Sequence, residues 1–395
     1  MYKKLLLFLF IGVHVSVFSQ TTDSVSTGLQ NANDVYYSFS TGIVKTQPIN
    51  NWDIAFEISG YTASILVNQA KGNELYQTPF SIAQWSSFDT TSFKSFKRMF
   101  NSEYTWALGA FNRHTDNNYD LGWGTYNTST HVIAGDSIFL IKLSDGTLKK
   151  ITILNLTSGV YNFKYASIDG SNEKTASIAK SNFKNKNFAY YSLSGDSSID
   201  REPLTSDWDL VFTKYTVFIP TPYNVAGVWT NKNTKTAKAT KVPTGIMSFS
   251  GYNFSDTNSV IGYNWKKYNA SLGKYSITDS LVFFVNTSKN NYYKIYFTGY
   301  AGGSQGKYYF VHQSIAASVN KISKANITIF PNPVSEELNI STNGQILSYN
   351  IKNLEGKSVL VGNDSTINTA ILAKGFYILN VNTSEGNTFV KFLKD

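Results

Sequence analysis

Alternation of apolar and polar residues is the main pattern in this chain, and it predicts β-strands. In the stretch NWDIAFE, the large residues Trp52, Ile54 and Phe56 occupy every second position. Because successive side chains of a strand point to opposite faces, we expect these three to share one buried face. Similar short stretches continue between clusters of Gly, Asn and Ser, which are typical of turns. The pattern predicts an all-β protein.

The stretch NWDIAFE has a second version, DWDLVFT, later in the chain. Four further blocks recur in the same order, which indicates an internal duplication. We interpret both tryptophans as core residues rather than as ligand-stacking residues. The repeat core comprises Trp52, Asp53, Phe56, Trp208, Asp209 and Phe212. The four further block pairs are 36–40 with 190–194, 123–127 with 265–269, 136–140 with 279–283, and 159–163 with 306–310.

Each copy is expected to end in a three-stranded meander. Asp145-Gly146 lies between two apolar runs and is a strong signal for a two-residue hairpin loop. Asn290-Asn291 takes its place in the second copy, and Asn also tolerates left-handed backbone. A short helix is expected around Phe93 to Met99. The predicted meander strands are 137–143, 148–155 and 160–166, followed by 279–285, 292–298 and 307–313.

The first residues of the chain have the pattern of a secretory signal peptide. Lys3 and Lys4 precede an apolar run from Leu5 to Val17, and Ser19-Gln20 form a small polar end. No later segment approaches the roughly 18 continuous apolar residues of a spanning helix, so we expect no transmembrane segment. The predicted segments are a signal peptide (1–20), repeat 1 (21–171), a polar, Lys-rich linker (172–187), repeat 2 (188–320) and a C-terminal domain (321–395).

The amino-acid composition excludes several kinds of functional site. The chain has no cysteine, which excludes disulfides, thiolate nucleophiles and Cys-ligated zinc. The formal net charge is +9, with a loose cluster at Lys232, Lys235, Lys238 and Lys241. Because these lysines lie among Thr and Asn without arginines, we interpret them as a solvated loop and expect no nucleic-acid partner.

The last seventy or so residues predict a small β-sandwich of about seven strands. Their order of landmarks resembles the type A C-terminal sorting domain of the type IX secretion system, over residues 325–395. The resemblance implies export across the outer membrane of a Bacteroidota-type bacterium, interaction with the secretion machinery, and release or surface attachment after cleavage. The landmarks are Pro331, Asn332, Pro333, Gly356, Lys357, Gly375 and Tyr377.

Motifs of enzymes are scarce. Residues 302–306 match G-x-S-x-G, but they join two predicted meander strands, whereas a nucleophile elbow joins a strand to a helix. Paired carboxylates are the other option, since Asp53 recurs as Asp209 and Asp136 as Asp279. Aspartates beside strands also cap turns, so recurrence fits a shared structural bond equally well. We therefore expect a protein without enzymatic activity.

A second resemblance covers residues 34–316. The order YYSFSTG then NWDIAFE, and YYSLSGD then DWDLVFTKY, resembles the HmuY family of bacterial haem-binding proteins. The resemblance implies haem as a cofactor, held by axial ligands that are commonly two histidines. His114 and His131 are the only histidine pair within one copy, with Met99 or Met247 as substitutes, and His312 is in the other copy.

The sequence thus predicts an exported, all-β, ligand-binding protein at or outside the cell surface. The first hypothesis is haem or haem-protein acquisition. The second is a carbohydrate-binding or adhesive module that uses aromatic residues to stack on sugars, and the third is a secreted hydrolase. The expected partners are accordingly the secretion machinery and haem, a host or environmental protein, or a glycan.

Overall fold

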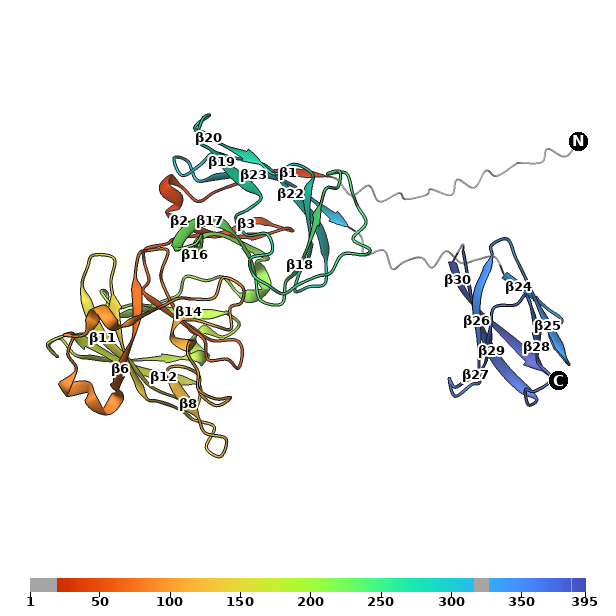
Figure 1. The fold of residues 1–395 in the computed structure, drawn as a ribbon, viewed down its shortest axis with the longest axis horizontal. Coiled ribbons are helices and arrows are strands. Elements are labelled where there is room, and N and C mark those ends of the chain that lie inside the picture. Colours follow the sequence, from red (N-terminus) through yellow and green to blue (C-terminus); the bar gives the residue numbers. More distant parts are fainter. Residues whose placement is uncertain (1–19, 316–326, 385) are drawn as a thin grey trace, which may run out of the picture. The chain divides into compact units, whose positions relative to one another are not determined.

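The structure is a computed structural model that describes residues 20–315, 327–384 and 386–395. Of the predicted signal peptide, residues 1–19 lie outside the described residues. The chain forms two compact units, one up to Ala316 and one from Ala317 onward (Figure 1). Both are built from antiparallel sheets, so the all-β prediction is confirmed.

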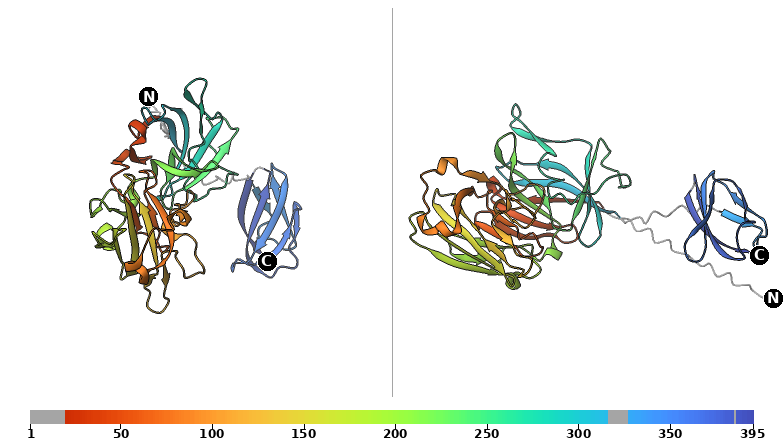
Figure 2. Two further views of the ribbon diagram at one scale, coloured as in Figure 1. Left: turned by 60° about the vertical axis from the view of Figure 1, so that its left-hand side comes forward. Right: turned by 60° about the horizontal axis from the view of Figure 1, so that its bottom comes forward.

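The larger unit has two halves, and the two sequence copies exchange their N-terminal segments between them. In half B, β1 and β2 of the first copy pair with β23 and β16 of the second. In half A, β13 and β14 of the second copy pair with β12 and β4 of the first. Figure 2 shows the N-terminal red strands among the green and cyan strands of half B. Each half is therefore completed by a segment of the other copy.

The elements of half A are β4 (Ile54–Glu57), β5 (Ile65–Val67), β6 (Glu74–Ser81), η2 (Ile82–Ser87), η3 (Phe93–Ser95), β7 (Lys97–Met99), η4 (Ala110–Asn112), β8 (Gly124–Tyr126), β9 (Ile133–Gly135), β10 (Ser137–Lys142), β11 (Leu148–Thr157), β12 (Val160–Ser167), β13 (Lys174–Ala179), η5 (Lys180–Phe183), β14 (Phe188–Ser192) and β15 (Ser197–Ile199). Those of half B are β1 (Thr21–Ser26), η1 (Leu29–Asn31), β2 (Asn33–Ser38), β3 (Gly42–Pro48), η6 (Thr205–Asp207), β16 (Leu210–Phe218), β17 (Pro222–Thr230), β18 (Lys235–Thr240), β19 (Lys266–Asn269), β20 (Lys274–Ile277), β21 (Leu281–Asn286), β22 (Tyr292–Tyr300) and β23 (Lys307–Ile315).

Asp53 and Asp209 hold the exchanged segments in place. The carboxylate of Asp53 accepts the backbone N–H of Leu193 at 2.8 Å, and that of Asp209 accepts the backbone N–H of Phe39 at 2.8 Å. Each aspartate also donates its own backbone N–H, at 2.8 Å, to the carbonyl two residues earlier in the exchanged segment. Their recurrence therefore has a structural cause, because both copies need the same bond at the same junction.

Trp52 and Trp208 do not lie on the buried face that the alternation predicts for them. Ile54 and Phe56 pack in the core of half A, whereas Trp52 lies in a separate cluster with Ala55 and Phe188. Strand β4 begins only at Ile54, so the two-residue alternation does not extend back to Trp52. The strand is buried on both faces, and its second face is turned toward the other half.

Both predicted meanders are present, as β10–β11–β12 and β21–β22–β23. The predicted linker differs: residues 172–187 contain β13, which pairs with β12 as β1 pairs with β23. Ile178 is its only fully buried side chain, so the strand carries little apolar signal. The helix expected around Phe93 to Met99 is instead η3 followed by β7.

The lysine cluster also differs from the predicted loop. Residues 235–240 form β18, an edge strand of the β1-β23-β22-β21-β18 sheet. Lys235 and Lys238 are exposed on it, while Ala237 and Ala239 are buried. Lysines are common on sheet edges because they oppose pairing with other strands.

The second unit is a sandwich of a three-stranded and a four-stranded sheet, in agreement with the predicted strand number. The Asn332 side chain accepts the backbone N–H of Leu393 at 2.9 Å, which ties the Pro-Asn-Pro segment to the last strand. Gly356, with φ +82°, closes the turn before Lys357, and the Tyr377 hydroxyl donates to the Ala373 carbonyl at 2.9 Å. Its strands are β24 (Ile327–Phe330), β25 (Glu337–Thr342), β26 (Ile346–Lys352), β27 (Ser358–Gly362), β28 (Thr366–Asn368), β29 (Gly375–Thr383) and β30 (Gly386–Lys394).

Replacing Asp53 by Ala should destabilise the larger unit strongly. Asp53 is fully buried, and besides the amide of Leu193 it binds the Lys71 ammonium at 2.7 Å and the Asn73 amide at 2.8 Å. Removing one partner of a buried ion pair costs about 3–5 kcal/mol. Denaturant unfolding of the mature chain measures this, with the exposed Asp116→Ala as control, expected within about 0.5 kcal/mol of the unmodified protein. A cost below about 1 kcal/mol for Asp53→Ala would contradict the assigned role.

Candidate functional site

An aromatic cavity lies between the two halves of the larger unit. It encloses about 80 Å³, roughly five times the space that a single buried water needs. Both copies and both exchanged segments contribute to its walls. The aromatic residues that line it are Tyr36, Trp52, Trp106, Phe188, Tyr190, Trp208, Tyr215 and Trp229.

The exchange builds the two sides of this cavity alike. Tyr36, on the exchanged β2, meets Trp208 edge to face, with ring centroids 5.0 Å apart and an interplanar angle of 78°. Tyr190, on the exchanged β14, meets Trp52 in the same way, at 5.0 Å and 81°. Each pair joins a tyrosine of one copy to the tryptophan of the other. The recurrence of the YYS and W-D blocks thus produces two matching aromatic walls.

Two further tryptophans, which have no counterpart in the other copy, contact each other at the interface between the halves. Trp106 belongs to the loop between β7 and η4 of half A, and its Nε1 donates to the Thr230 carbonyl of half B at 2.9 Å. Its ring meets Trp229 at 4.9 Å and 88°, and Trp229 lies 4.6 Å from Tyr215. This side of the cavity therefore differs from a strict two-fold repeat.

Several polar side chains that line the cavity have no hydrogen-bond partner among the described residues. The unpartnered atoms are the indole Nε1 of Trp52 and of Trp208 and the Gln69 amide nitrogen. A buried donor without an acceptor costs about 1–3 kcal/mol. All three can donate, so the cavity suits a ligand that is rich in acceptors.

Arg201 is the charged centre of one wall. It is 2% exposed, and its guanidinium binds the Asp34 carboxylate at 2.8 Å and the Pro48 carbonyl at 3.0 Å. Asp34 also accepts the Thr213 hydroxyl at 2.5 Å. Strand β2 supplies Asp34 and β16 supplies Thr213, so this network joins both copies around an ion pair whose two members are satisfied.

Glu202, next along the chain, is also fully buried. Burial raises its pKa to about 7, although its carboxylate accepts the backbone N–H groups of Phe188, at 3.0 Å, and Asn187, at 3.3 Å. The Tyr190 hydroxyl donates to it at 3.2 Å. Glu202 thus places in the cavity wall a carboxyl group whose pKa lies near neutral pH.

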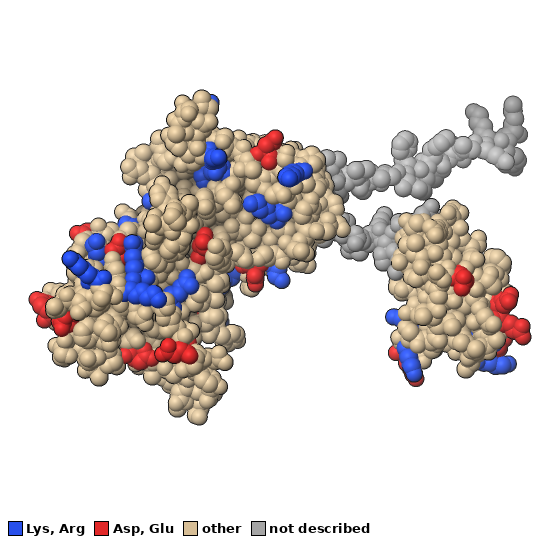
Figure 3. All heavy atoms as spheres, in the orientation of Figure 1, with Lys and Arg blue, Asp and Glu red and all other residues tan. Residues whose placement is uncertain are grey.

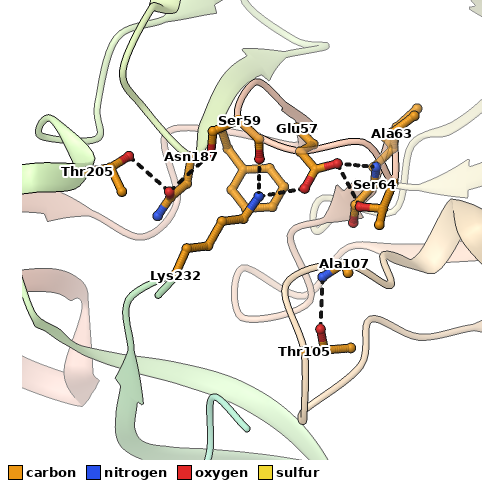
Figure 4. Close-up of polar contacts among 12 residues, drawn as sticks. Glu57, Ser59, Ala63, Ser64, Thr105, Ala107, Asn187, Thr205 and Lys232 are labelled. Atoms are coloured by element: carbon orange, nitrogen blue, oxygen red, sulfur yellow. Dashed lines mark hydrogen bonds and ion pairs between the residues drawn. The ribbon is translucent and has the colours of Figure 1, made fainter. Parts of the chain in front are cut away.

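A second ion pair crosses between the halves. Lys232, which follows β17, reaches the buried Glu57 at the end of β4, with 2.5 Å between Nζ and Oε1, and donates to the Ser59 carbonyl (Figure 4). Its Nζ lies 5.0 Å from the centre of the Phe188 ring. Lys232 is therefore part of the interface between the halves, and not part of a solvated loop.

The predicted site residues are placed as follows. Trp52 and Trp208 are buried, as predicted, and both also line the cavity. His114 is exposed beside Lys97, and the partial desolvation of its ring, followed by the Lys97 and Arg113 charges, lowers its pKa. His131 is exposed and contacts the Tyr126 hydroxyl at 2.7 Å.

Neither His114 nor His131 lines the aromatic cavity, and haem ligation by this pair stays a prediction. His312 is buried against the Tyr37 hydroxyl at 3.0 Å, and burial lowers its pKa. Among the described residues, no group of three His, Asp or Glu side chains could hold a metal ion. The segment 302–306 is the hairpin loop expected between β22 and β23.

Four cavity residues escape sequence reasoning: Trp106, Arg201, Glu202 and Trp229. They lie in segments that differ between the copies, so recurrence does not mark them. The only signal is their type, since the chain has seven tryptophans and few arginines.

Glu202 should make stability depend on pH. Its folded-state pKa of about 7 lies above the ordinary value of 4.5. Between these two pH values, Glu202 is protonated in the folded chain and ionised in the unfolded chain. That contribution is present at low pH and is lost as the pH rises from 4.5 to 7. Glu202→Gln should therefore lose less thermal stability than the unmodified chain between pH 5 and pH 8. The exposed Asp116→Asn is the control, and an unchanged pH profile for Glu202→Gln would exclude the assignment.

Comparison with known families and proteins bears on the C-terminal unit. Residues 328–395 match the family of secretion system C-terminal sorting domains, while the HmuY likeness of residues 34–316 receives no support and stays a prediction. A search of curated proteins finds no match. No helix within the described ranges is long and apolar enough to cross a membrane. The chain thus carries a C-terminal sorting domain that indicates export by the type IX secretion system to the cell surface or the extracellular space.

Proposed function

We propose that the exported chain is a saccharide-binding protein and that the aromatic cavity holds one sugar ring. The observation that carries this proposal is the convergence of four tryptophans from both halves, two of them with unpartnered indole N–H groups. A sugar ring offers apolar C–H faces for aromatic stacking and hydroxyl oxygens as acceptors. A sugar ring therefore matches both the aromatic walls and the unpartnered donors of the cavity.

The size of the cavity supports a small ligand. Sites for drug-sized ligands occupy about 300–1,000 Å³, whereas this cavity encloses about 80 Å³. One ring, or the end of a longer glycan, matches that space better than a haem macrocycle does. The half-buried Lys214 and Thr216 line the same cavity and add polar groups to its wall.

The carboxylates of the cavity support binding rather than hydrolysis. A glycosidase needs one carboxylic acid and one carboxylate free to act on the substrate. Asp34 is occupied by Arg201 and Thr213, and Glu202 by two backbone N–H groups and Tyr190. The recurrent Asp53 and Asp209 are occupied by the backbone of the exchanged segments. We therefore propose a non-enzymatic cargo.

A glycan panel followed by calorimetric titration of the mature chain tests this function. Trp229→Phe keeps an aromatic ring but removes one donor, so affinity for the selected saccharide should fall roughly 2- to 10-fold. Trp85→Phe is the matched control, because Trp85 lies in another cluster and donates to Glu173. Its affinity should equal that of the unmodified chain.

Two results would overturn the proposal. One is that no saccharide in the panel binds, or that binding is equal in the Trp229→Phe and unmodified chains. The other is release of new reducing ends from the bound saccharide, lost in Glu202→Gln, which would assign hydrolysis instead.

A further inference from the structure

The excess of positive over negative charge is larger in half B than in half A. Between Thr257 and Ile315 the chain contains six lysines and a single acidic residue, Asp279. In Figure 3 most of the visible surface of half B, the upper part of the larger unit, is uncharged, and its few Lys and Arg side chains are separated from one another. An anionic ligand of half B must therefore bind one lysine at a time and make most of its contacts with uncharged groups around it.

One hollow in half B has that composition. It encloses about 320 Å³ and lies between the β19–β20 hairpin and the loop that joins β22 to β23. Tyr268, Tyr275 and Tyr300 form one side, Lys274 lies at the hairpin end, and residues 301–304 form the other side. It is distinct from the aromatic cavity, with which it shares no lining residue.

The three tyrosines form a ladder from the surface to the interior. Tyr268 and Tyr275 are directly opposed across the hairpin, with centroids 5.2 Å apart, and Tyr275 meets Tyr300 at 4.9 Å. Tyr300 is buried and its hydroxyl donates to Asn31, so it fixes the inner end. Tyr268 remains 54% exposed, which leaves a ring available for stacking.

Lys274 supplies the charge at this hollow. It is exposed, and no carboxylate of the described residues forms an ion pair with it. Asp279, the acidic residue nearest in sequence, lines a different hollow with Leu281 and Tyr296. An anionic group placed beside Tyr268 would thus meet an unpaired ammonium and no opposing carboxylate nearby in sequence.

We propose that this hollow binds an acidic polysaccharide of the polyuronate type. One sugar ring stacks on Tyr268 and Tyr275, and a uronate carboxylate binds Lys274. The loop of residues 301–304, which contains two glycines and one serine, lies against the edge of the bound polysaccharide. A linear polymer is the occupant that fits, because the hollow is open at the surface and the Tyr268 ring beside it is exposed. The site goes beyond the single-ring cavity proposed above and does not depend on it.

Affinity electrophoresis of the mature chain in gels containing polygalacturonate, with neutral dextran as reference, tests the proposal. Polygalacturonate should retard the protein, and dextran should not. Tyr268→Ala and Lys274→Ala should each weaken retardation roughly 3- to 10-fold. Lys274→Ala should also reduce its dependence on salt, because one charge contact is lost.

Matched controls separate this site from the others. Lys238→Ala removes an exposed lysine of β18 and Tyr61→Ala removes a fully exposed tyrosine of half A, and both should leave retardation unchanged. Trp229→Phe should also leave it unchanged, whatever its effect in the aromatic cavity. Equal losses in Lys238→Ala and Lys274→Ala would show general charge attraction and overturn the proposal. So would loss in Trp229→Phe alone, or binding to vesicles of anionic lipid without binding to polygalacturonate.

Discussion

The bond between a buried aspartate and the backbone of the other copy is the constraint on which the larger unit depends. Asp53 fixes the segment that begins with β13, and Asp209 fixes the segment that begins with β1. Without these bonds, buried amides would be left without acceptors at the two junctions where the chain passes from one half to the other. The repeated Trp-Asp stretch is therefore the mark of an exchange rather than of two independent domains.

The exchange also determines where a ligand site can form. It places the first tyrosine of each YYS block against the tryptophan of the other copy, so both aromatic pairs face the space between the halves. Segments without counterparts then make that space asymmetric: Trp106 and Trp229 on one side, Arg201 and Glu202 on another. Lys232 and Glu57 add a buried ion pair across the same interface. Residues without a counterpart in the other copy thus supply these parts of the cavity wall.

Much of the fold could be predicted from the sequence, because its signals are local. Asp145-Gly146 and the runs around it specify the first meander, and β10, β11 and β12 follow closely. Strand β13 has little apolar signal because Ile178 is its only fully buried side chain. The exchange leaves no signal, because alternation does not indicate which copy a strand pairs with. The cavity could not be predicted, since Trp106 and Trp229 are far apart in the sequence and meet only where the two halves pack against each other.

The most direct test of the saccharide-binding account is ¹⁹F NMR of the mature chain labelled with 5-fluorotryptophan. The chain has seven tryptophans, four of which line the aromatic cavity. On addition of the saccharide chosen from the panel, the account predicts shifts for Trp52, Trp106, Trp208 and Trp229, and none for Trp85, Trp123 and Trp265. Shifts confined to the last three, or seven unchanged resonances at saturating saccharide, would contradict it.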